Sequence, residues 1–301
     1  MVEDKIHIVM AADETYRKGL EVAKASLSES CAHPERLVFH LFDGDAAFAD
    51  RVRREFGTYK GSTMAFLRLY LGELLPDVDW VVYSDVDTIW RRDVAELWEL
   101  RDENATIQWV RDLKGTVVEF KSWCAARGVP LDGFDPGRYC CSGVCLVNLK
   151  RWRERNVLDR CREFAARFGC PKYADQDILN AILGDEAALL PDCWDVLVPS
   201  PENSPRCVLH LTGVGRCFAA PYDGRVAQYL YWQRIARGTP FKRPLALPFY
   251  LREWMIRLCF PFAGAVLCDR IRRHFAWRWF VRRHFAETDH DERIPWKTSA
   301  V

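Results

Sequence analysis

The sequence predicts an α/β domain built on a mostly parallel β-sheet. Short runs of consecutive apolar residues recur along the chain, and such runs are typical of strands buried on both faces. Segments with apolar residues at helical spacing separate these runs. Polar and acidic residues follow several of the runs directly. Because ligands of α/β sheets bind where the strands end, these residues are the candidates for function.

Each predicted strand is a short apolar run bounded by polar or turn-forming residues. The first, Ile6-His-Ile-Val-Met-Ala11, is nearly continuous, and the second, Leu37-Val-Phe-His-Leu-Phe42, is closed by Asp43-Gly44. The third, Trp80-Val-Val-Tyr83, leads directly into an acidic pair. Together the predicted strands span residues 6–11, 37–42, 80–83, 105–110, 144–147 and 207–211.

Helices are expected between these strands. One runs from about residue 64 to 75 and stops at Pro76, because proline cannot continue a helix. Residues 152–168 form a strongly amphipathic stretch, which predicts a helix with one buried face. Together the predicted helices span residues 19–27, 64–75, 93–100, 152–168 and 175–183.

The composition is that of a folded globular chain. Its 301 residues are 49% hydrophobic and 28% charged, and the net charge of +1 gives no reason to expect nucleic acid as a partner. The twelve cysteines include no pair with the spacing of a zinc site. The start of the chain lacks the pattern of an export leader, and no apolar run reaches the roughly 18 residues of a membrane span. We therefore expect reduced thiols and a cytoplasmic protein.

The last part of the chain differs in charge from the rest. Between residues 242 and 285 there are ten basic and two acidic residues, so this stretch carries a charge of +8 and the remainder −7. Tryptophan and phenylalanine alternate with the arginines. This pattern predicts a main domain at 1–240 and a basic, aromatic-rich, helical segment at 241–301 that binds an anionic membrane surface. The alternative is a helical segment packed on the main domain with a basic face in solvent.

Four groups of polar residues stand at or near strand ends. Ala11-Ala-Asp13 follows the first strand, where a nucleotide-binding loop is expected, although Asp13 is equally suited to cap a helix. Asp85-Val-Asp87 follows the third strand, and two carboxylates so close together can both bind Mg²⁺ or Mn²⁺. The alternative for this pair is an acidic turn.

The other two groups lie in the second half of the chain. His210 lies near the end of the last predicted strand and can be either a buried core residue or a ligand of Mn²⁺. After it, Gly213 and Arg216 are suited to approach a phosphate through backbone N–H groups and a guanidinium. Asp175-Gln-Asp177 opens a predicted helix, and capping explains only one of its three polar side chains.

Five ordered segments of the sequence resemble glycosyltransferase family 8, which includes bacterial lipopolysaccharide galactosyl- and glucosyltransferases and glycogenin. They are Ile8-Val-Met-Ala-Ala-Asp13, Val82-Tyr-Ser-Asp-Val-Asp87, Ser142-Gly-Val-Cys-Leu-Val-Asn148-Leu-Lys-Arg-Trp152, Asp175-Gln-Asp-Ile-Leu-Asn180 and His210-Leu-Thr-Gly213. The similarity covers roughly residues 5–235. It implies a GT-A fold and the transfer of a hexose from a UDP-sugar with retention of configuration, with Mn²⁺ or Mg²⁺ as cofactor.

The resemblance also implies a role for individual residues. The metal ligands implied are Asp85, Asp87 and His210. The nucleotide and diphosphate contacts implied are Ala11, Asp13, Thr15, Tyr16, Asp85, Val86, Gly213 and Arg216. The groups implied around the donor sugar, taken as catalytic, are Arg68, Asp112, Asp175 and Gln176.

Two features depart from the family pattern. Cys141 stands where the family commonly has asparagine, and a thiol is a weaker hydrogen-bonding group than an amide. Residues 43–63 form a shorter segment than in the lipopolysaccharide enzymes, so a loop that covers the substrate is expected to be reduced.

The function expected is transfer of galactose or glucose from UDP-hexose to a glycan or lipid-linked acceptor of surface-polysaccharide synthesis, at the inner face of the cell membrane. A cation and Arg216 would stabilise the departing diphosphate, and same-face attack is favoured over a covalent intermediate. Two alternatives stay open: a nucleotide-sugar-binding protein without turnover, and a scaffold protein that does not bind UDP.

Overall fold

The structure is a computed structural model, and it describes residues 4–14, 16–59, 61–112, 116–131, 134–196 and 207–210. All of these residues belong to one compact unit, Met1–Gly213. The domain boundary predicted at residue 240 and the basic, aromatic-rich segment at 241–301 lie outside the described residues, so both stay predictions. No helix in the described ranges is long and apolar enough to cross a membrane.

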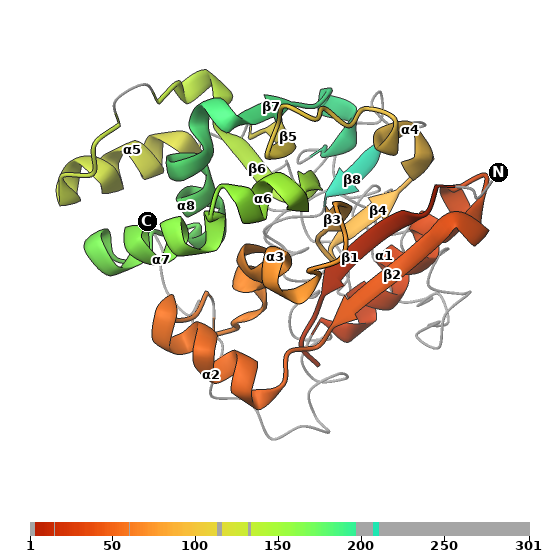
Figure 1. Ribbon diagram of the computed structural model, residues 1–301, viewed down its shortest axis with the longest axis horizontal. Coiled ribbons are helices and arrows are strands. Elements are labelled where there is room, and N and C mark those ends of the chain that lie inside the picture. Colours follow the sequence, from red (N-terminus) through yellow and green to blue (C-terminus); the bar gives the residue numbers. More distant parts are fainter. Residues whose placement is uncertain are drawn as a thin grey trace, which may run out of the picture. The chain divides into compact units, whose positions relative to one another are not determined.

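A six-stranded mixed sheet forms the centre of this unit, with strand order β2-β1-β3-β6-β5-β7 (Figure 1). The strands are β1 (Ile6–Ala11), β2 (Leu37–Phe42), β3 (Trp80–Ser84), β5 (Ile107–Arg111), β6 (Cys140–Asn148) and β7 (Ala187–Leu189). A second, two-stranded sheet pairs β4 (Thr88–Trp90) with β8 (Val208–His210). β1 is parallel to β2 and β3, and β5 is parallel to β7. β6 is antiparallel to both of its neighbours, so the mostly parallel sheet that was predicted carries one reversed strand.

The helices lie along the chain between these strands. They are α1 (Arg17–Ser30), α2 (Ala46–Glu55), α3 (Leu71–Leu74), α4 (Val94–Trp98), α5 (Thr116–Arg127), α6 (Leu149–Glu154), α7 (Val157–Phe168) and α8 (Ala174–Leu183). Short 3-10 helices span Pro34–Arg36, Met64–Tyr70, Pro136–Arg138, Gly184–Glu186 and Asp192–Trp194. The alternation of strands and helices confirms the predicted α/β class.

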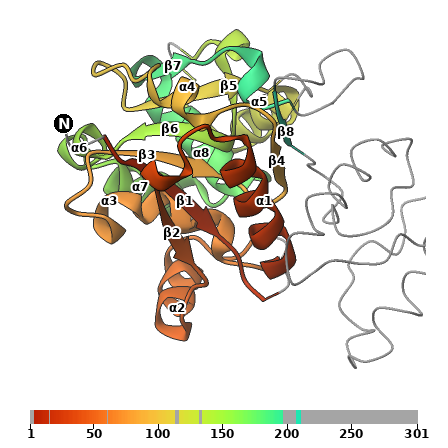
Figure 2. The same ribbon diagram turned by 90° about the vertical axis from the view of Figure 1, so that its right-hand side faces the viewer.

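The two faces of the sheet bury separate hydrophobic cores. In β1, Ile6, Ile8 and Met10 pack with α1 and α4 on one face, whereas Val9 and Ala11 contact the core on the other face. This second core includes residues of α2, α5, α7 and α8. Figure 2 shows α1 on one side of β1 and β2 and α3 on the other. Alternate residues of a strand point to opposite faces, which is why a nearly continuous apolar run was needed here.

Two predicted helices differ from those observed. The helix expected at 64–75 begins as a 3-10 helix, Met64–Tyr70, and only Leu71–Leu74 is α-helical. The helix expected at 152–168 is two helices, α6 and α7, because Asn156 adopts the left-handed conformation with φ 49°. Asparagine tolerates that conformation better than most residues, so the break has a local cause that the amphipathic pattern concealed.

Within the described residues, two α-helices and two strands were absent from the prediction. They are α2, α5, β4 and β7. The first of them lies within the segment 43–63, where Asp45 caps its N-terminus by accepting a hydrogen bond from the backbone N–H of Phe48 (2.7 Å). Strand β6 is also longer than predicted, because it begins at Cys140. Small and polar residues at its start hide it from a search for apolar runs.

Candidate active site

The acidic pair after β3 lies beside the end of β8. Asp85 directly follows β3, and its backbone N–H donates to the carbonyl of Gly143 in β6 (2.7 Å). The chain then turns into β4, whose Thr88 pairs with His210 of β8. Antiparallel pairing of β4 and β8 therefore brings His210 next to Asp87, although 123 residues separate them along the chain.

His210 is the centre of a cluster of three carboxylates. Its Nε2 lies 3.1 Å from Oδ1 of Asp87 and 3.6 Å from Oδ2 of Asp85. Its Nδ1 lies 2.8 Å from Oδ1 of Asp195, which immediately follows the 3-10 helix Asp192–Trp194. Only 2% of His210 is exposed. The structure thus brings together the three residues predicted as metal ligands and adds a fourth polar group that was not predicted.

The chemistry of this cluster fits a divalent cation. Asp85, Asp87 and His210 each offer one ligand atom, and these atoms lie within 4.8 Å of one another. Two carboxylate oxygens and an imidazole nitrogen suit Mn²⁺. The electrostatics agree, since burial alone would lower the pKa of His210, but Asp195 and Asp87 raise it well above its usual value. The carboxylates around His210 therefore stabilise positive charge at this place.

Gly143 is what allows the imidazole to lie where it does. A Cβ atom added at this glycine would stand 2.0 Å from Cε1 of His210 and 2.5 Å from its Nδ1. Such separations are far shorter than a van der Waals contact, so any side chain here would displace the ring. Glycine at position 143 is thus a requirement of the cluster.

Arg68 connects this cluster to the start of α8. It belongs to the 3-10 helix Met64–Tyr70, and only 5% of it is exposed. Its Nη2 lies 2.7 Å from Oδ1 of Asp85, and its Nε lies 2.8 Å from Oδ2 of Asp175. It also donates to the carbonyl of Ser142, and its guanidinium stacks 4.2 Å from the centre of the Tyr83 ring. Arg68 is therefore a buried cation that fixes two of the predicted carboxylates.

The first turn of α8 carries the predicted sugar-site residues. Asp175 accepts a hydrogen bond from the hydroxyl of Ser142 (3.0 Å), and burial raises its pKa to about 6 although Arg68 lowers it. Gln176 accepts from the backbone N–H of Ser142 (3.2 Å) through Oε1. Its Nε2 donates to Asp112 (3.1 Å) and to the hydroxyl of Tyr139 (3.1 Å). Arg68, Asp112, Asp175 and Gln176 thus form one continuous hydrogen-bonded group.

The predicted nucleotide contacts are grouped only in part. Ala11 is the last residue of β1, which is parallel to β3. Val86, between Asp85 and Asp87 in the sequence, is buried. Asp13 accepts a hydrogen bond from the hydroxyl of Ser62 (2.7 Å), and its backbone carbonyl accepts from the N–H of Tyr16 (2.9 Å). Thr15, Gly213 and Arg216 lie outside the described residues.

Asp195, which contacts His210, was not predicted. Asp177 belonged to a predicted polar group without an assigned role, and it accepts hydrogen bonds from the Tyr139 hydroxyl and from the backbone N–H of Tyr173. Asp195 follows Trp194 in an otherwise apolar stretch, which was the available signal for a buried carboxylate. Cys141, predicted to alter the donor site, has its Sγ 3.8 Å from Nδ1 of His210.

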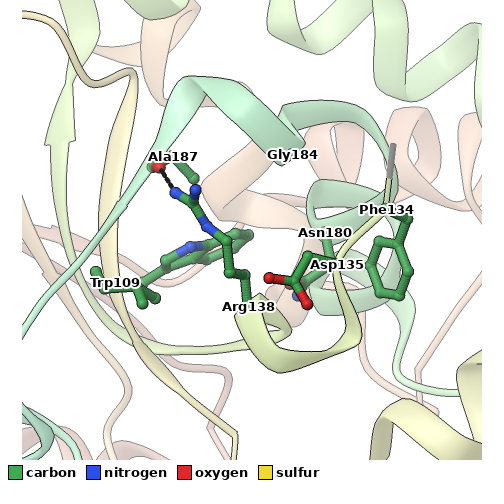
Figure 3. A pocket seen from close by; sticks show the side chains of 8 residues that line it. Trp109, Phe134, Asp135, Arg138, Asn180, Gly184 and Ala187 are labelled. Carbon is green, nitrogen blue, oxygen red and sulfur yellow. Dashed lines mark hydrogen bonds between the residues drawn. The ribbon is translucent and has the colours of Figure 1, made fainter. Parts of the chain in front are cut away.

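A small hollow lies away from these residues, beside β5 and β7 (Figure 3). Its lining includes Trp109, Asn180 and Arg138, and Arg138 donates to the carbonyl of Ala187 (2.6 Å). Asn180 is bonded in both directions to the backbone of Cys140. Because these polar groups are already paired and none of the predicted site residues lines the hollow, the His210 cluster is the candidate site.

Comparison with known families and relatives gives a consistent result. The sequence model of glycosyl transferase family 8 matches residues 54–210, more than half of the chain. A protein of Haemophilus influenzae named as a glycosyltransferase is 30% identical over 122 residues, which are 40% of this chain and 35% of that protein. General stress protein A of Bacillus subtilis is 25% identical over 224 residues, covering 65% of this chain and 75% of that protein. The lipopolysaccharide 1,2-glucosyltransferase of Escherichia coli is 26% identical over 135 residues, or 43% and 37% of the two chains.

The match to the Haemophilus protein thus spans about a third of that protein's length. Solved structures share the fold over a larger part of the chain. The galactosyltransferase LgtC, solved with donor and acceptor sugar analogues, superposes with a TM-score of 0.60 at 23% identity, covering 80% of this chain and 98% of that one. GlyE of Streptococcus pneumoniae superposes with a TM-score of 0.58 at 20% identity, covering 85% and 64%. These similarities confirm the predicted GT-A fold.

Proposed function

The chain belongs to glycosyl transferase family 8, and on that basis we propose that it transfers a hexose, galactose or glucose, from a UDP-sugar to a glycan or lipid-linked acceptor with retention. The observation that carries the proposal is the convergence of Asp85, Asp87 and His210 at the end of β3. This is the position at which α/β sheets bind their ligands.

The cation site is assigned to these three side chains, with Mn²⁺ as the ion and Mg²⁺ as the alternative. When bound there, the ion would supply positive charge for the departing diphosphate. Asp85 is oriented for this role by Arg68, which occupies its Oδ1 and leaves Oδ2 facing His210. Arg216 and Gly213 are proposed as further diphosphate contacts, and Ala11, Asp13, Thr15, Tyr16 and Val86 as the uridine side of the site.

The sugar is proposed to lie against the first turn of α8. Here Arg68 contacts Asp175, and Ser142 and Tyr139 hold Gln176. Gln176 in turn donates to Asp112. The carbonyl oxygen of Gln176 already accepts the N–H of Ser142, which makes this weak nucleophile weaker still. That contact favours same-face attack over a covalent intermediate on Gln176, with Gln176 and Asp112 positioning the sugar by hydrogen bonds.

The acceptor and the location are proposed from two sources. One relative is named as a lipopolysaccharide glucosyltransferase, which supports a surface-glycan acceptor. The basic, aromatic-rich segment at 241–301 supports peripheral attachment to the inner face of the membrane, where lipid-linked acceptors would be met.

The test is a panel of UDP-sugars, incubated with the protein in Mn²⁺, in Mg²⁺ or in a chelator, with release of UDP as the readout. UDP-galactose or UDP-glucose should be hydrolysed slowly with Mn²⁺ and faster when glycan acceptors are added. Asp87→Ala should abolish both the release and the metal-dependent binding of UDP, because it removes one of the proposed ligands. Asp77→Ala, at an exposed carboxylate before the same strand, is the matched control and should behave like the wild type.

Other outcomes would point to the alternatives. Binding of UDP that depends on metal, without release from any sugar, would indicate a nucleotide-sugar-binding protein. Failure to bind UDP at all would indicate a scaffold. Unchanged metal-dependent UDP binding in Asp87→Ala would remove the ligand assignment.

A further inference from the structure

His210 has a carboxylate on the side that faces away from Asp85 and Asp87. Oδ1 of Asp195 lies 2.8 Å from its Nδ1, and the Asp195 side chain is completely buried. The sequence resemblance assigns no role to this aspartate, and it lies 15 residues before His210 in the chain.

The backbone fixes the distance between the two residues. The N–H of Val196, next to Asp195, donates to the carbonyl of Val208 (2.9 Å), and the N–H of His210 donates to the carbonyl of Val196 (3.1 Å). On the other side of Asp195, the buried ring of Trp194 lies 6.4 Å from that of Trp90. The residues on both sides of Asp195 are therefore fixed, Val196 by its backbone hydrogen bonds to β8 and Trp194 by packing. The backbone thus holds Asp195 beside His210.

A neutral imidazole carries one N–H, and a hydrogen-bond acceptor at one nitrogen decides which nitrogen holds it. An ionised carboxylate can only accept, so Asp195 places the proton of a neutral His210 on Nδ1. The lone pair then lies on Nε2, the nitrogen that faces Asp85 and Asp87. A carboxylate in this position also fixes the plane of the ring and makes the ligating nitrogen more basic.

The surroundings of Asp195 indicate that its contact with His210 is the one that compensates for its burial. Among the described residues, its Oδ2 is buried without a hydrogen-bond partner. A buried carboxylate with so few partners costs free energy, and the contact with His210 offsets that cost. The Cys141 thiol lies 3.8 Å from the same Nδ1, but a thiol is a weak acceptor beside a carboxylate.

We propose that Asp195 is a positioning residue of the cation site: through Nδ1–H of His210 it directs the Nε2 lone pair at the ion held by Asp85 and Asp87. This assignment rests on the proposed function, since it requires a cation at that place. Asp195 acts through His210 and contacts neither the ion nor the sugar.

The test measures Mn²⁺ affinity, by titrating Mn²⁺ into the full-length protein with saturating UDP in a calorimeter. Asp195→Ala should raise the Kd for Mn²⁺ about 10- to 100-fold. At saturating Mn²⁺, UDP should bind the variant about as tightly as the wild type, because excess ion compensates for a misoriented ligand. Asp195→Asn has nearly the same size and keeps an oxygen acceptor, so its loss should be smaller than that of the alanine variant.

Two controls separate positioning from a merely structural role. Asp192→Ala removes an exposed carboxylate from the neighbouring 3-10 helix and should leave the Mn²⁺ affinity unchanged. In a His210→Ala background, Asp195→Ala should raise the Kd for Mn²⁺ less than about twofold, since the side chain through which Asp195 acts is gone. Thermal melting without metal identifies any variant that is unfolded. If Asp195→Ala is unfolded, the Mn²⁺ affinity of Asp195→Asn is compared with that of the wild type instead.

The outcomes are distinct. Wild-type protein whose UDP binding ignores Mn²⁺ would overturn the proposed function and this assignment with it. Metal-dependent wild-type binding together with an unchanged Mn²⁺ affinity in Asp195→Ala would overturn the assignment alone. The assignment alone would also be overturned if the losses of Mn²⁺ affinity in Asp195→Ala and His210→Ala were fully additive in the double variant.

Discussion

Single atoms decide the geometry around His210. The imidazole lies against the backbone of β6 at Gly143, and a methyl group there would overlap its ring. The same strand supplies Ser142, whose backbone and hydroxyl bond Arg68, Asp175 and Gln176. Gly143 and Ser142 therefore contact His210, the proposed cation ligand, on one side and the proposed sugar-site residues on the other.

Gly143→Ala should weaken Mn²⁺ binding by at least about tenfold, because His210 must leave its position to make room for the methyl group. The measurement is Mn²⁺ titration of the UDP complex, with circular dichroism to verify folding. In a His210→Ala background the ring is absent, so the same glycine substitution should have little further effect. If Gly143→Ala bound Mn²⁺ as tightly as the wild type, the position of the His210 imidazole against Gly143 would not matter for cation binding.

At the scale of elements, the start of α8 explains why three polar residues open this helix. The N-cap residue is Tyr173, so none of the three polar residues is the N-cap that the capping alternative required; Asp177 accepts the N–H of Tyr173 from inside the helix. Asp175 and Gln176 instead contact Arg68, Ser142 and Asp112. All three side chains are buried, which is unusual for the first turn of a helix and is consistent with the proposed sugar site.

Gln176→Ala should lower the turnover number by about 10- to 1000-fold while UDP affinity stays nearly intact, because the residue is proposed to contact the sugar and not the nucleotide. Steady-state release of UDP and calorimetric UDP binding measure the two quantities separately. Equal losses in both would indicate that Gln176 serves mainly to hold Ser142 and Tyr139 in place.

Asp177 should make the stability of the protein depend on pH. Burial raises its pKa to about 6, although hydrogen bonds from Tyr139 and Tyr173 lower it. The folded protein then binds this proton more tightly than the unfolded chain, so the contribution is complete below about pH 4 and is lost as pH rises through about 6.

The free energy of unfolding of the wild type should therefore fall, relative to that of Asp177→Asn, by about 2 to 3 kcal/mol between pH 4 and pH 7. Urea denaturation at several pH values gives the difference, in which the contributions of other groups largely cancel. Parallel pH profiles for the two proteins would place the pKa of Asp177 near its ordinary value.

At the scale of the whole molecule, charge divides the chain. Residues 242–285 carry +8 and the remainder −7. The net charge near zero therefore conceals a segment whose composition suits binding to anionic lipid. Each arginine near an anionic membrane surface contributes about 1 kcal/mol to the free energy of binding. This segment lies outside the described residues, and its role stays a prediction from the sequence.

The full-length protein should bind phosphatidylglycerol vesicles at low salt, and high salt should reduce the binding without eliminating it, because screening weakens the arginines and not the aromatic side chains. Phosphatidylcholine vesicles are the uncharged control. Truncation after Pro240 should remove the binding, provided that the shortened protein still binds UDP. Full-length protein that ignores anionic vesicles would support the alternative of a segment packed on the catalytic domain.

What the sequence determined by itself is the local part of this structure. Apolar runs located β1, β2, β3 and β5 to within two residues at their ends, because burial on both faces requires apolar side chains in succession. The same pattern marked Asp85, Asp87 and His210 as strand-end residues, and the resemblance grouped them.

Only the tertiary structure decided how these residues meet and which further residue joins them. Pairing between β4 and β8 brings Asp87 to His210 across 123 residues, and the register of Val196 against β8 adds Asp195. The reversal of β6 likewise has no trace in an apolar run, which looks the same in either direction. A hydrophobic pattern records how deeply a segment is buried, whereas its partner, direction and register follow from contacts between segments far apart in the chain.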